Sequence, residues 1–335
     1  MSATAEKITF GQAFNLAMDE ALATDPRVIL LGEDIADDQG GGVWKATAGL
    51  SAKHGTHRVR STPIAEQAIV GAAVGAAIAG YRPVAEIMLM NFITVAMDQI
   101  VNHAAKLRFM SGGQTGVPLT IRTASGAGRG FGGQHSDMLE AWFAHVPGLK
   151  VVTGSTPAEA KGLLLSCIEA DDPCIFIENT ATYRLQGEAP PPGFRIPLGK
   201  ANVVREGSDV TVVGYGRPIA DALVVASKLA AEGISIEIVD LRTIAPFDLP
   251  TVLTSVAKTK RAVIIHEAAR DFGVGAEVSS RIHEELFSEL LSPCVRAGSS
   301  FCPVPFSPVL EQSYLISADD IEAAIRTSLN GGKRK

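Results

Sequence analysis

The 335-residue sequence lacks an apolar run that could cross a membrane, and it lacks a long basic segment. Its longest low-polarity run covers residues 68–80, which is shorter than the roughly 20 residues that a membrane-spanning helix needs. The net charge of -6 argues against a surface that binds nucleic acid. We therefore expect a protein that binds neither a membrane nor a nucleic acid.

Cysteine is also scarce. The chain has four cysteines, and none of them shows the paired short spacing of a zinc or redox motif: Cys167, Cys174, Cys294 and Cys302. Buried free thiols suit a reducing compartment better than a disulfide framework does. We expect a cytoplasmic protein.

Several common catalytic motifs are missing. The sequence has no Gly-x-Ser-x-Gly elbow and no phosphate loop that ends in Gly-Lys-Ser/Thr. The glycine-rich stretch at residues 126–133 only superficially resembles a dinucleotide loop, because in the register that begins at Gly126 the motif's last glycine is replaced by Phe131. We favour a flexible loop of a substrate channel, which lets backbone approach a ligand, and a mobile surface loop is the alternative.

The composition is that of a well-buried globular enzyme, with 46% hydrophobic and 20% charged residues. In the first half, apolar strand candidates alternate with helices, which indicates a mainly parallel sheet covered on both faces. A stiff, proline-rich break at residues 186–193 follows, and the alternation then starts again. We predict an α/β chain of two mainly parallel, doubly wound domains, with residues 1–186 and 198–335 joined by a linker at 187–197.

Hydrophobic periodicity gives the expected elements. Strands are expected at 28–31, 83–89, 117–122, 149–153, 174–178, 210–213, 234–239 and 262–266, and helices at 94–110, 137–145, 157–169, 219–231, 249–256 and 276–287.

Glu66 is the most unusual acidic residue, because its neighbours from Thr62 to Val70 are mostly apolar or small. Thr62 suits a helix cap and Pro63 the first helical position, so a helix is predicted to begin there, with Glu66 beyond the capping-box position. An acid on so apolar a face should resist ionisation, which is useful in proton transfer. The alternative is a partly exposed glutamate that the helix dipole favours.

Other polar residues follow predicted strands. Glu33 comes just after the strand at 28–31, and His266-Glu267 occupies the equivalent place in the second half. Open parallel sheets bind ligands at this carboxyl edge. His135 closes the glycine-rich loop, where it would serve as an acid, a base or an anchor for substrate; a structural histidine beside a capping Ser136 is the alternative.

In combination, these segments resemble the β subunit of the thiamine-diphosphate-dependent decarboxylating component of 2-oxo acid dehydrogenase complexes. The matching stretches follow the family's order from residue 32 to residue 268: 32–35, 41–43, 62–66, 82–87, 98–100, 135–136, 147–152, 160–164, 240–243 and 266–268. No single stretch decides the resemblance, but the ordered set is highly specific.

The resemblance implies a transketolase-like pyrimidine-binding domain followed by a transketolase C-terminal domain. It implies that Glu66 hydrogen-bonds a ring nitrogen of the cofactor's aminopyrimidine and favours the imino tautomer, which takes the proton from the thiazolium carbon. The other positions carried over from the family are Glu33 lining the cofactor pocket, Ile64 and Met88 contacting the pyrimidine, Phe92 stacking on it, and His135 beside the substrate and the arriving lipoyl group.

The resemblance also implies a structural potassium ion, held largely by backbone carbonyls. The matching positions are Val117, Leu119, Thr120, Cys167, Ala170 and Asp172. The family's diphosphate and magnesium motif, Gly-Asp-Gly followed by an asparagine pair, is absent from the chain. An α subunit would therefore supply that half of the site, in a heterotetramer of two α and two β subunits.

The function implied is oxidative decarboxylation of pyruvate or a branched-chain 2-oxo acid, with transfer of the acyl group to the lipoyl group of an acyltransferase component. Two positions depart from the family: Ser61 replaces the usual aspartate, and Asp137 replaces the usual glutamine. A charge at Asp137 would weaken binding of an anionic 2-oxo acid but would disturb uncharged acetoin less. The alternatives are thus the β subunit of an acetoin dehydrogenase, half of a split transketolase, and a non-catalytic scaffold.

Overall fold

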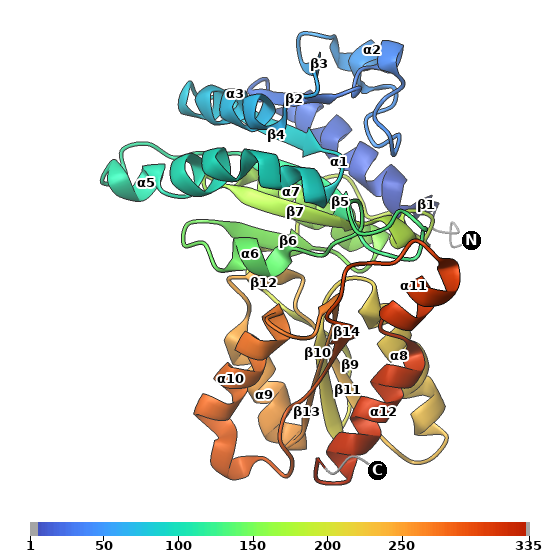
Figure 1. Ribbon diagram of the computed structural model, residues 1–335. Coiled ribbons are helices and arrows are strands. Elements are labelled where there is room, and N and C mark those ends of the chain that lie inside the picture. The colour runs from blue at the N-terminus through green and yellow to red at the C-terminus, as the bar shows by residue number, and fades with distance from the viewer. Residues whose placement is uncertain (1–5, 333–335) are drawn as a thin grey trace, which may run out of the picture. The chain divides into compact units, whose positions relative to one another are not determined.

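The computed structural model describes residues 6–332, which form two compact units (Figure 1). The first unit comprises the described residues up to Ser125 and residues 142–198, and the second comprises residues 126–141 and those from Gly199 onward. The two domains predicted from the sequence were each a continuous stretch of chain, and residues 126–141 were assigned to the first of them. Segment 126–141 belongs to the second unit because Glu267 and Glu311 accept hydrogen bonds from its backbone.

The first unit is built on a parallel sheet with the strand order β6-β7-β5-β4-β2-β3. Each neighbouring pair in this order runs parallel, as predicted from the continuous apolar runs. The strands are β2 (Val28–Glu33), β3 (Val59–Thr62), β4 (Arg82–Ile87), β5 (Thr120–Ser125), β6 (Lys150–Thr153) and β7 (Cys174–Asn179). A separate antiparallel pair joins β1 (Lys7–Thr9) and β8 (Gln186–Glu188).

The helices of the first unit are α1 (Phe10–Thr24), α2 (Leu50–His54), α3 (Glu66–Ile78), α4 (Met90–Ile93), α5 (Leu107–Met110) and α7 (Pro157–Glu169). The boundary at which the chain passes from the second unit back to the first falls within α6 (Glu140–Ala144). Helix α1 begins with a capping box in which Thr9 and Gln12 each accept the other's backbone N–H. Its apolar residues recur every three or four positions and pack with α7 and strands β2 and β7 in one buried cluster.

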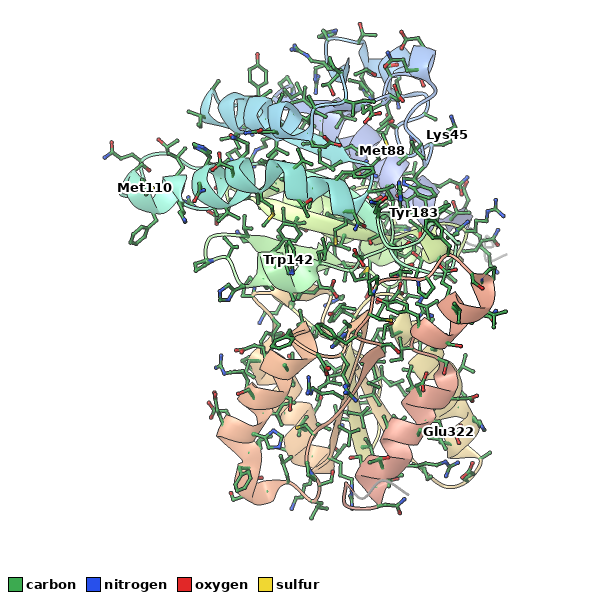
Figure 2. The ribbon with its side chains drawn as sticks, in the orientation of Figure 1. Lys45, Met88, Met110, Trp142, Tyr183 and Glu322 are labelled. Atoms are coloured by element: carbon green, nitrogen blue, oxygen red, sulfur yellow. The ribbon has the colours of Figure 1, made fainter. Side chains whose placement is uncertain are left out.

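The long helix predicted at 94–110 is irregular in the structure. A 3-10 turn at Thr94–Ala96 leads into a π-helical stretch at Gln99–Ala104 and then into α5. Its end is very open, with 90% of Phe109 and 74% of Met110 exposed (Figure 2). The helix predicted at 137–145 is also shorter, because α6 begins only at Glu140.

The second unit has the sheet order β14-β13-β10-β11-β9, parallel except for β9. The strands of this sheet are β9 (Asn202–Arg205), β10 (Val210–Gly214), β11 (Ile236–Asp240), β13 (Ala262–Ala269) and β14 (Val295–Ser299). The unit also contains the short strand β12 (Thr243–Ala245), which is not part of this sheet. Its helices are α8 (Pro218–Ala230), α9 (Leu249–Thr259), α10 (Val274–Leu286), α11 (Pro308–Tyr314) and α12 (Ala318–Leu329). On α12, Glu322 pairs with Lys228 of α8 at 2.7 Å (Figure 2). The sequence did not predict β9, β14, α11 or α12.

All four cysteines are free thiols, as expected. Cys167 and Cys174 are buried, but Cys294 is partly exposed and Cys302 is exposed, so the expectation of buried thiols holds for two of the four. Within residues 6–332, no helix has both the length and the apolar character needed to cross a bilayer.

Candidate active site

Residues predicted to bind the cofactor gather at the carboxyl ends of three neighbouring strands of the first unit. Glu33 ends β2 and pairs in register with Thr62, the last residue of β3. Glu66 begins α3 just beyond β3, and Met88 directly follows β4 on the other side of β2. This is the edge at which open parallel sheets bind ligands.

The start of α3 differs from the prediction. The helix begins at Glu66, with Ala65 rather than Thr62 at the cap position. Thr62 is part of β3, where pairing with β2 outweighs its local preference for capping a helix. Glu66 is therefore half-buried in the first helical turn, where the helix dipole favours a carboxylate.

Ser61, one of the two departures from the family pattern, lies beside this edge. Its hydroxyl accepts a hydrogen bond from the backbone N–H of Ala36 at 2.9 Å. The serine thereby ties β3 to the segment that follows Glu33, without the negative charge that the usual aspartate would bring.

Glu33 and Glu66 interact electrostatically. Burial raises the pKa of Glu33 above its usual value, and the charges of Asp34 and Glu66 raise it further. Glu66, predicted to share the cofactor pocket with Glu33, is therefore near enough to raise the pKa of Glu33.

The apolar residues of the predicted pocket are at least partly open to solvent. Ile64, two residues before Glu66, is 74% exposed, and Met88 and Phe92 are half-buried. A large apolar side chain left open beside two carboxyl groups fits an aromatic ring that carries nitrogen atoms. These residues of the first unit thus suit the pyrimidine ring of thiamine diphosphate.

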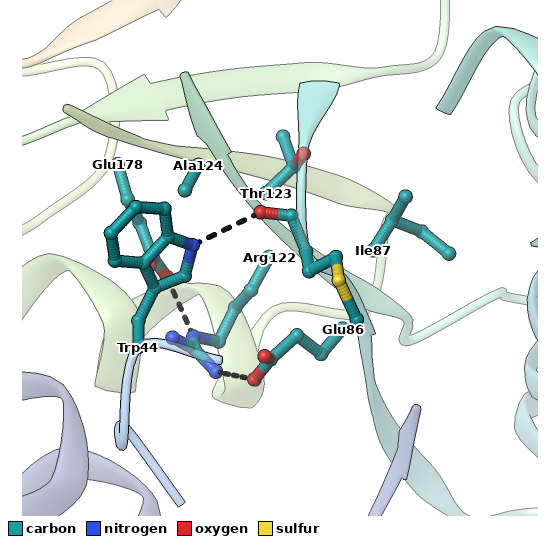
Figure 3. Close-up of a pocket in the computed structure, with 8 residues that line it drawn as sticks. Trp44, Glu86, Ile87, Arg122, Thr123, Ala124 and Glu178 are labelled. Carbon is teal, nitrogen blue, oxygen red and sulfur yellow. Dashed lines mark hydrogen bonds and ion pairs between the residues drawn. The ribbon is translucent and has the colours of Figure 1, made fainter. Parts of the chain in front are cut away.

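A buried ion cluster and Met88 line the same small gap within the sheet (Figure 3). Arg122 of β5 is 2% exposed and lies 2.7 Å from Glu86 of β4 and 2.7 Å from Glu178 of β7. Trp44 closes the space over the cluster and donates its indole N–H to the carbonyl of Met88 at 3.3 Å. The gap between these side chains has no room for a water molecule, so it supports the site and is not itself a ligand pocket.

The positions matched to potassium lie near the opposite, amino end of the sheet. Some of their oxygens already have partners: the Ala170 carbonyl accepts from Arg82 at 3.0 Å, and the Asp172 carboxylate binds Arg108 and Lys150. The Thr120 hydroxyl, by contrast, is buried without a hydrogen-bond partner, which suits an oxygen ligand. Val117, Leu119 and Cys167 are also buried. Potassium binding by these six residues stays a prediction.

Side chains that commonly bind metal ions do not form a cluster in the described part of the chain. Among these residues, no three or more His, Cys, Asp or Glu side chains are arranged to hold a metal ion.

His135 lies in the second unit, at the end of the glycine-rich loop. It is half-buried, and its backbone N–H donates to the carbonyl of Gly132 at 3.2 Å. Next to it, Ser136 is buried with a hydroxyl that has no hydrogen-bond partner, and Asp137 is half-buried. Ser136 does not cap a helix, because α6 begins only at Glu140. The sequence interpretation of Ser136 as a cap is wrong.

A second buried cluster lies at the carboxyl edge of the second unit's sheet. Tyr215, just after β10, donates its hydroxyl proton to Glu140 at 2.7 Å and stacks on His266 of β13. Burial raises the pKa of Glu140 to about 7 and lowers that of His266 to about 4. His266 is thus held neutral, and its Nε2 has no hydrogen-bond partner.

The raised pKa of Glu140 predicts a pH-dependent loss of stability in the second unit. Between pH 4.5 and about 7 the carboxyl ionises in the unfolded chain but keeps its proton in the folded one, so stability falls as pH rises, by about 3 kcal/mol in total. Glu140→Gln cannot ionise and should therefore be the more stable form at pH 7.5. Urea unfolding, followed by amide exchange in β10 and β13, measures the difference.

The control for this prediction is the pH itself. His266 works in the opposite direction, since its lowered pKa costs stability as pH falls from 6.5 towards 4, but this effect is present in both proteins and cancels. The advantage of Glu140→Gln should be small at pH 5 and grow towards pH 7.5. An equal difference between the two proteins at both pH values would contradict the assignment.

Sequence reasoning overlooked several of these supporting residues. Glu86 and Glu178 follow apolar residues in β4 and β7, and a charge at such a place signals a buried partner of opposite charge. Arg122 stands between Ile121 and Thr123 in the more polar strand β5, where this signal is weaker. Glu311 offered no such signal, because its helix, α11, was not predicted. Trp44 lies in an irregular segment, so no periodicity pointed to it.

Comparison with known proteins decides the family. Residues 6–186 match the transketolase pyrimidine binding domain, and residues 199–321 match the transketolase C-terminal domain. The chain is 46% identical to the β subunit of acetoin:2,6-dichlorophenolindophenol oxidoreductase from Cupriavidus necator, over 98% of this chain and 99% of that one. It is 42% identical to the mitochondrial pyruvate dehydrogenase E1 component subunit β of Bos taurus, over 97% and 91%.

The chain belongs to this family of β subunits with transketolase pyrimidine-binding and C-terminal domains. The solved structure of a split-gene transketolase, described as an inactive beta4 tetramer, has the same fold, with a TM-score of 0.78 and 24% identity over 97% of this chain and 99% of that one. The predicted fold class, a transketolase-like two-domain α/β chain, is confirmed.

Proposed function

We propose that the chain is the β half of a thiamine-diphosphate-dependent dehydrogenase that oxidatively decarboxylates pyruvate or a branched-chain 2-oxo acid. The observation that carries the proposal is the placement of Glu66 and Glu33 at one strand edge, in a chain with both transketolase domains. The family relationship supports the presence of a separate α partner, since both named relatives are β subunits.

The roles of the first unit's residues follow from their chemistry. When bound, thiamine diphosphate supplies a nucleophilic carbon and an electron sink. Glu66 hydrogen-bonds a ring nitrogen of the pyrimidine and shares a proton with it. Glu33, whose pKa the charge of Glu66 helps to raise, lines the same pocket. Ile64, Met88 and Phe92 form the apolar wall that excludes water from this exchange and strengthens it.

The remaining parts of the proposal concern partners. His135 binds the substrate and the incoming lipoyl group of an acyltransferase component, as a hydrogen-bond donor to their oxygen or sulfur atoms. The α subunit holds the diphosphate and magnesium, in an assembly of two α and two β chains. The four free thiols suit work in the reducing cytoplasm.

Acetoin is the second candidate substrate. The similarity to an acetoin-oxidising enzyme's β subunit favours it, and so does Asp137, an acid two residues after His135 that disfavours an anionic 2-oxo acid. A neutral hydroxyketone would meet no such repulsion.

The experiment that tests the proposal mixes this chain with its α subunit, thiamine diphosphate and magnesium, and follows reduction of an artificial electron acceptor. The substrates are pyruvate, 2-oxoisovalerate, 2-oxobutanoate and acetoin. We expect turnover on one of them that neither chain shows alone. If the two chains bind each other but none of the four substrates is turned over, the result would contradict the proposal and favour a split transketolase half or a scaffold.

A further inference from the structure

Two buried carboxylates hold the backbone of the glycine-rich loop at residues 126–133. Glu267, at the end of β13, accepts the N–H of Ala127 at 3.0 Å. Glu311, on α11, accepts the N–H of Gly128 at 2.8 Å and that of Gly130 at 3.0 Å. Glu267 is 2% exposed and Glu311 is 3% exposed. The bond to Ala127 is buried, and the two bonds from the glycines to Glu311 are partly buried.

The loop has the backbone conformation that such binding needs. Gly128 and Gly130 have φ values of +99° and +69°, which L side chains rarely adopt, and this conformation directs both N–H groups at one carboxylate. At Gly132, a Cβ would come within 2.5 Å of the Phe306 ring. The loop is therefore anchored at three amides and packed closely, which differs from the flexible loop expected from the sequence.

A single arginine orders the two glutamates. Arg217 lies 2.6 Å from the second carboxylate oxygen of Glu267 and donates to the carbonyl of Ile316, two residues after α11. It thus fixes the acid that binds Ala127 and also the end of the helix that carries Glu311. We call Arg217, Glu267 and Glu311 the loop clamp.

The anchored loop leads directly to His135, whose backbone N–H bonds to Gly132. We propose that Glu311 and Glu267 are positioning residues that set the place of His135 for the reaction, an inference that rests on the role given to His135 in the proposed function. In this role neither glutamate needs to touch the substrate. Their carboxylates act through the loop backbone, which a neutral or shorter side chain holds less well.

The test uses the assembled αβ enzyme with Glu311→Gln and Glu311→Ala. Glutamine keeps one neutral acceptor oxygen and alanine keeps none, so any effect on the loop should be larger in Glu311→Ala. Arg129 is exposed between the two clamped glycines, and trypsin cleavage after it reports how often the loop opens. We expect cleavage at least about tenfold faster in Glu311→Ala than in wild type, with Glu311→Gln between them.

Turnover is measured on the same proteins. If the clamp positions His135, kcat falls in the same order, at least about tenfold in Glu311→Ala. The affinity for thiamine diphosphate should stay unchanged, because the first unit and the α subunit are proposed to hold the cofactor. Glu285→Gln, on an exposed glutamate of α10, is the matched control and should change neither readout. Unchanged affinity for thiamine diphosphate in both variants, together with intermediate behaviour of Glu311→Gln, would argue against general misfolding.

Several outcomes would overturn the inference. Unchanged cleavage in Glu311→Ala would show that the carboxylate does not hold the loop. Faster cleavage with full turnover would show a clamp that is structural only. Full turnover of a His135→Asn enzyme would show that the reaction does not need His135, so the clamp would have no catalytic residue to position. Failure of the proposed function is distinguishable, because the wild-type enzyme itself would then be inactive.

Discussion

Glu66→Gln is expected to reduce turnover of the assembled enzyme by about 10²- to 10⁴-fold, the usual contribution of a group that transfers a proton. Glutamine keeps the size and a hydrogen-bonding amide but cannot take up or release the proton. Because Glu66 is half-buried at the first turn of α3, its replacement should leave the fold intact. The measurement is kcat on the best substrate of the panel.

The matched control for Glu66→Gln is Glu188→Gln, on an exposed glutamate of β8 in the same unit. It should keep full turnover, and both variants should assemble with the α subunit. A Glu66→Gln enzyme within about twofold of wild type would contradict the proton-transfer role, and it would favour the alternative of a helix-start glutamate that only the dipole stabilises.

Arg122→Met is expected to destabilise the first unit by about 3–5 kcal/mol, the cost of removing one partner from a buried ion pair. The change would leave Glu86 and Glu178 buried without their cation. Burial and the charge of Glu86 already raise the pKa of Glu178, and Arg122 opposes that rise. Without the arginine, both acids would have to bind protons or be exposed to water.

Tryptophan fluorescence measures this loss, because the chain's two tryptophans, Trp44 and Trp142, both belong to the first unit. The midpoint of denaturant unfolding should fall for Arg122→Met and stay unchanged for Arg184→Met, an exposed arginine of the same unit. A variant that also carries Glu86→Gln and Glu178→Gln should recover part of the loss. Equal midpoints for Arg122→Met and wild type would contradict the prediction.

Local signals predicted some elements well. Helix α7 has the predicted bounds, Pro157–Glu169, because Thr156 caps it and Pro157 stands at its first position. Strands such as β2 and β7 were predicted from continuous apolar runs, which occur where both faces of a sheet are covered. Such patterns depend only on residues close together in the chain.

Other local signals were overruled by distant partners. Thr62 looked like a helix cap, but pairing of β3 with β2 made it the end of a strand and moved the helix start to Glu66. The glycine-rich loop looked flexible, but Glu311, far along the chain, binds its amides. Capping and loop preferences amount to about 1 kcal/mol or less, so several tertiary hydrogen bonds outweigh them.

The sequence by itself determined the fold class, the family and the identity of Glu66 and Glu33 as candidate site residues, because periodicity and ordered motifs are properties of the chain. Only the tertiary structure decided which groups support them. The Arg122 ion cluster and the loop clamp each join three residues from separate elements, and their stability comes from burial and charge pairing, which exist only when the chain is folded. The periodicity of residues along the chain does not predict such contacts.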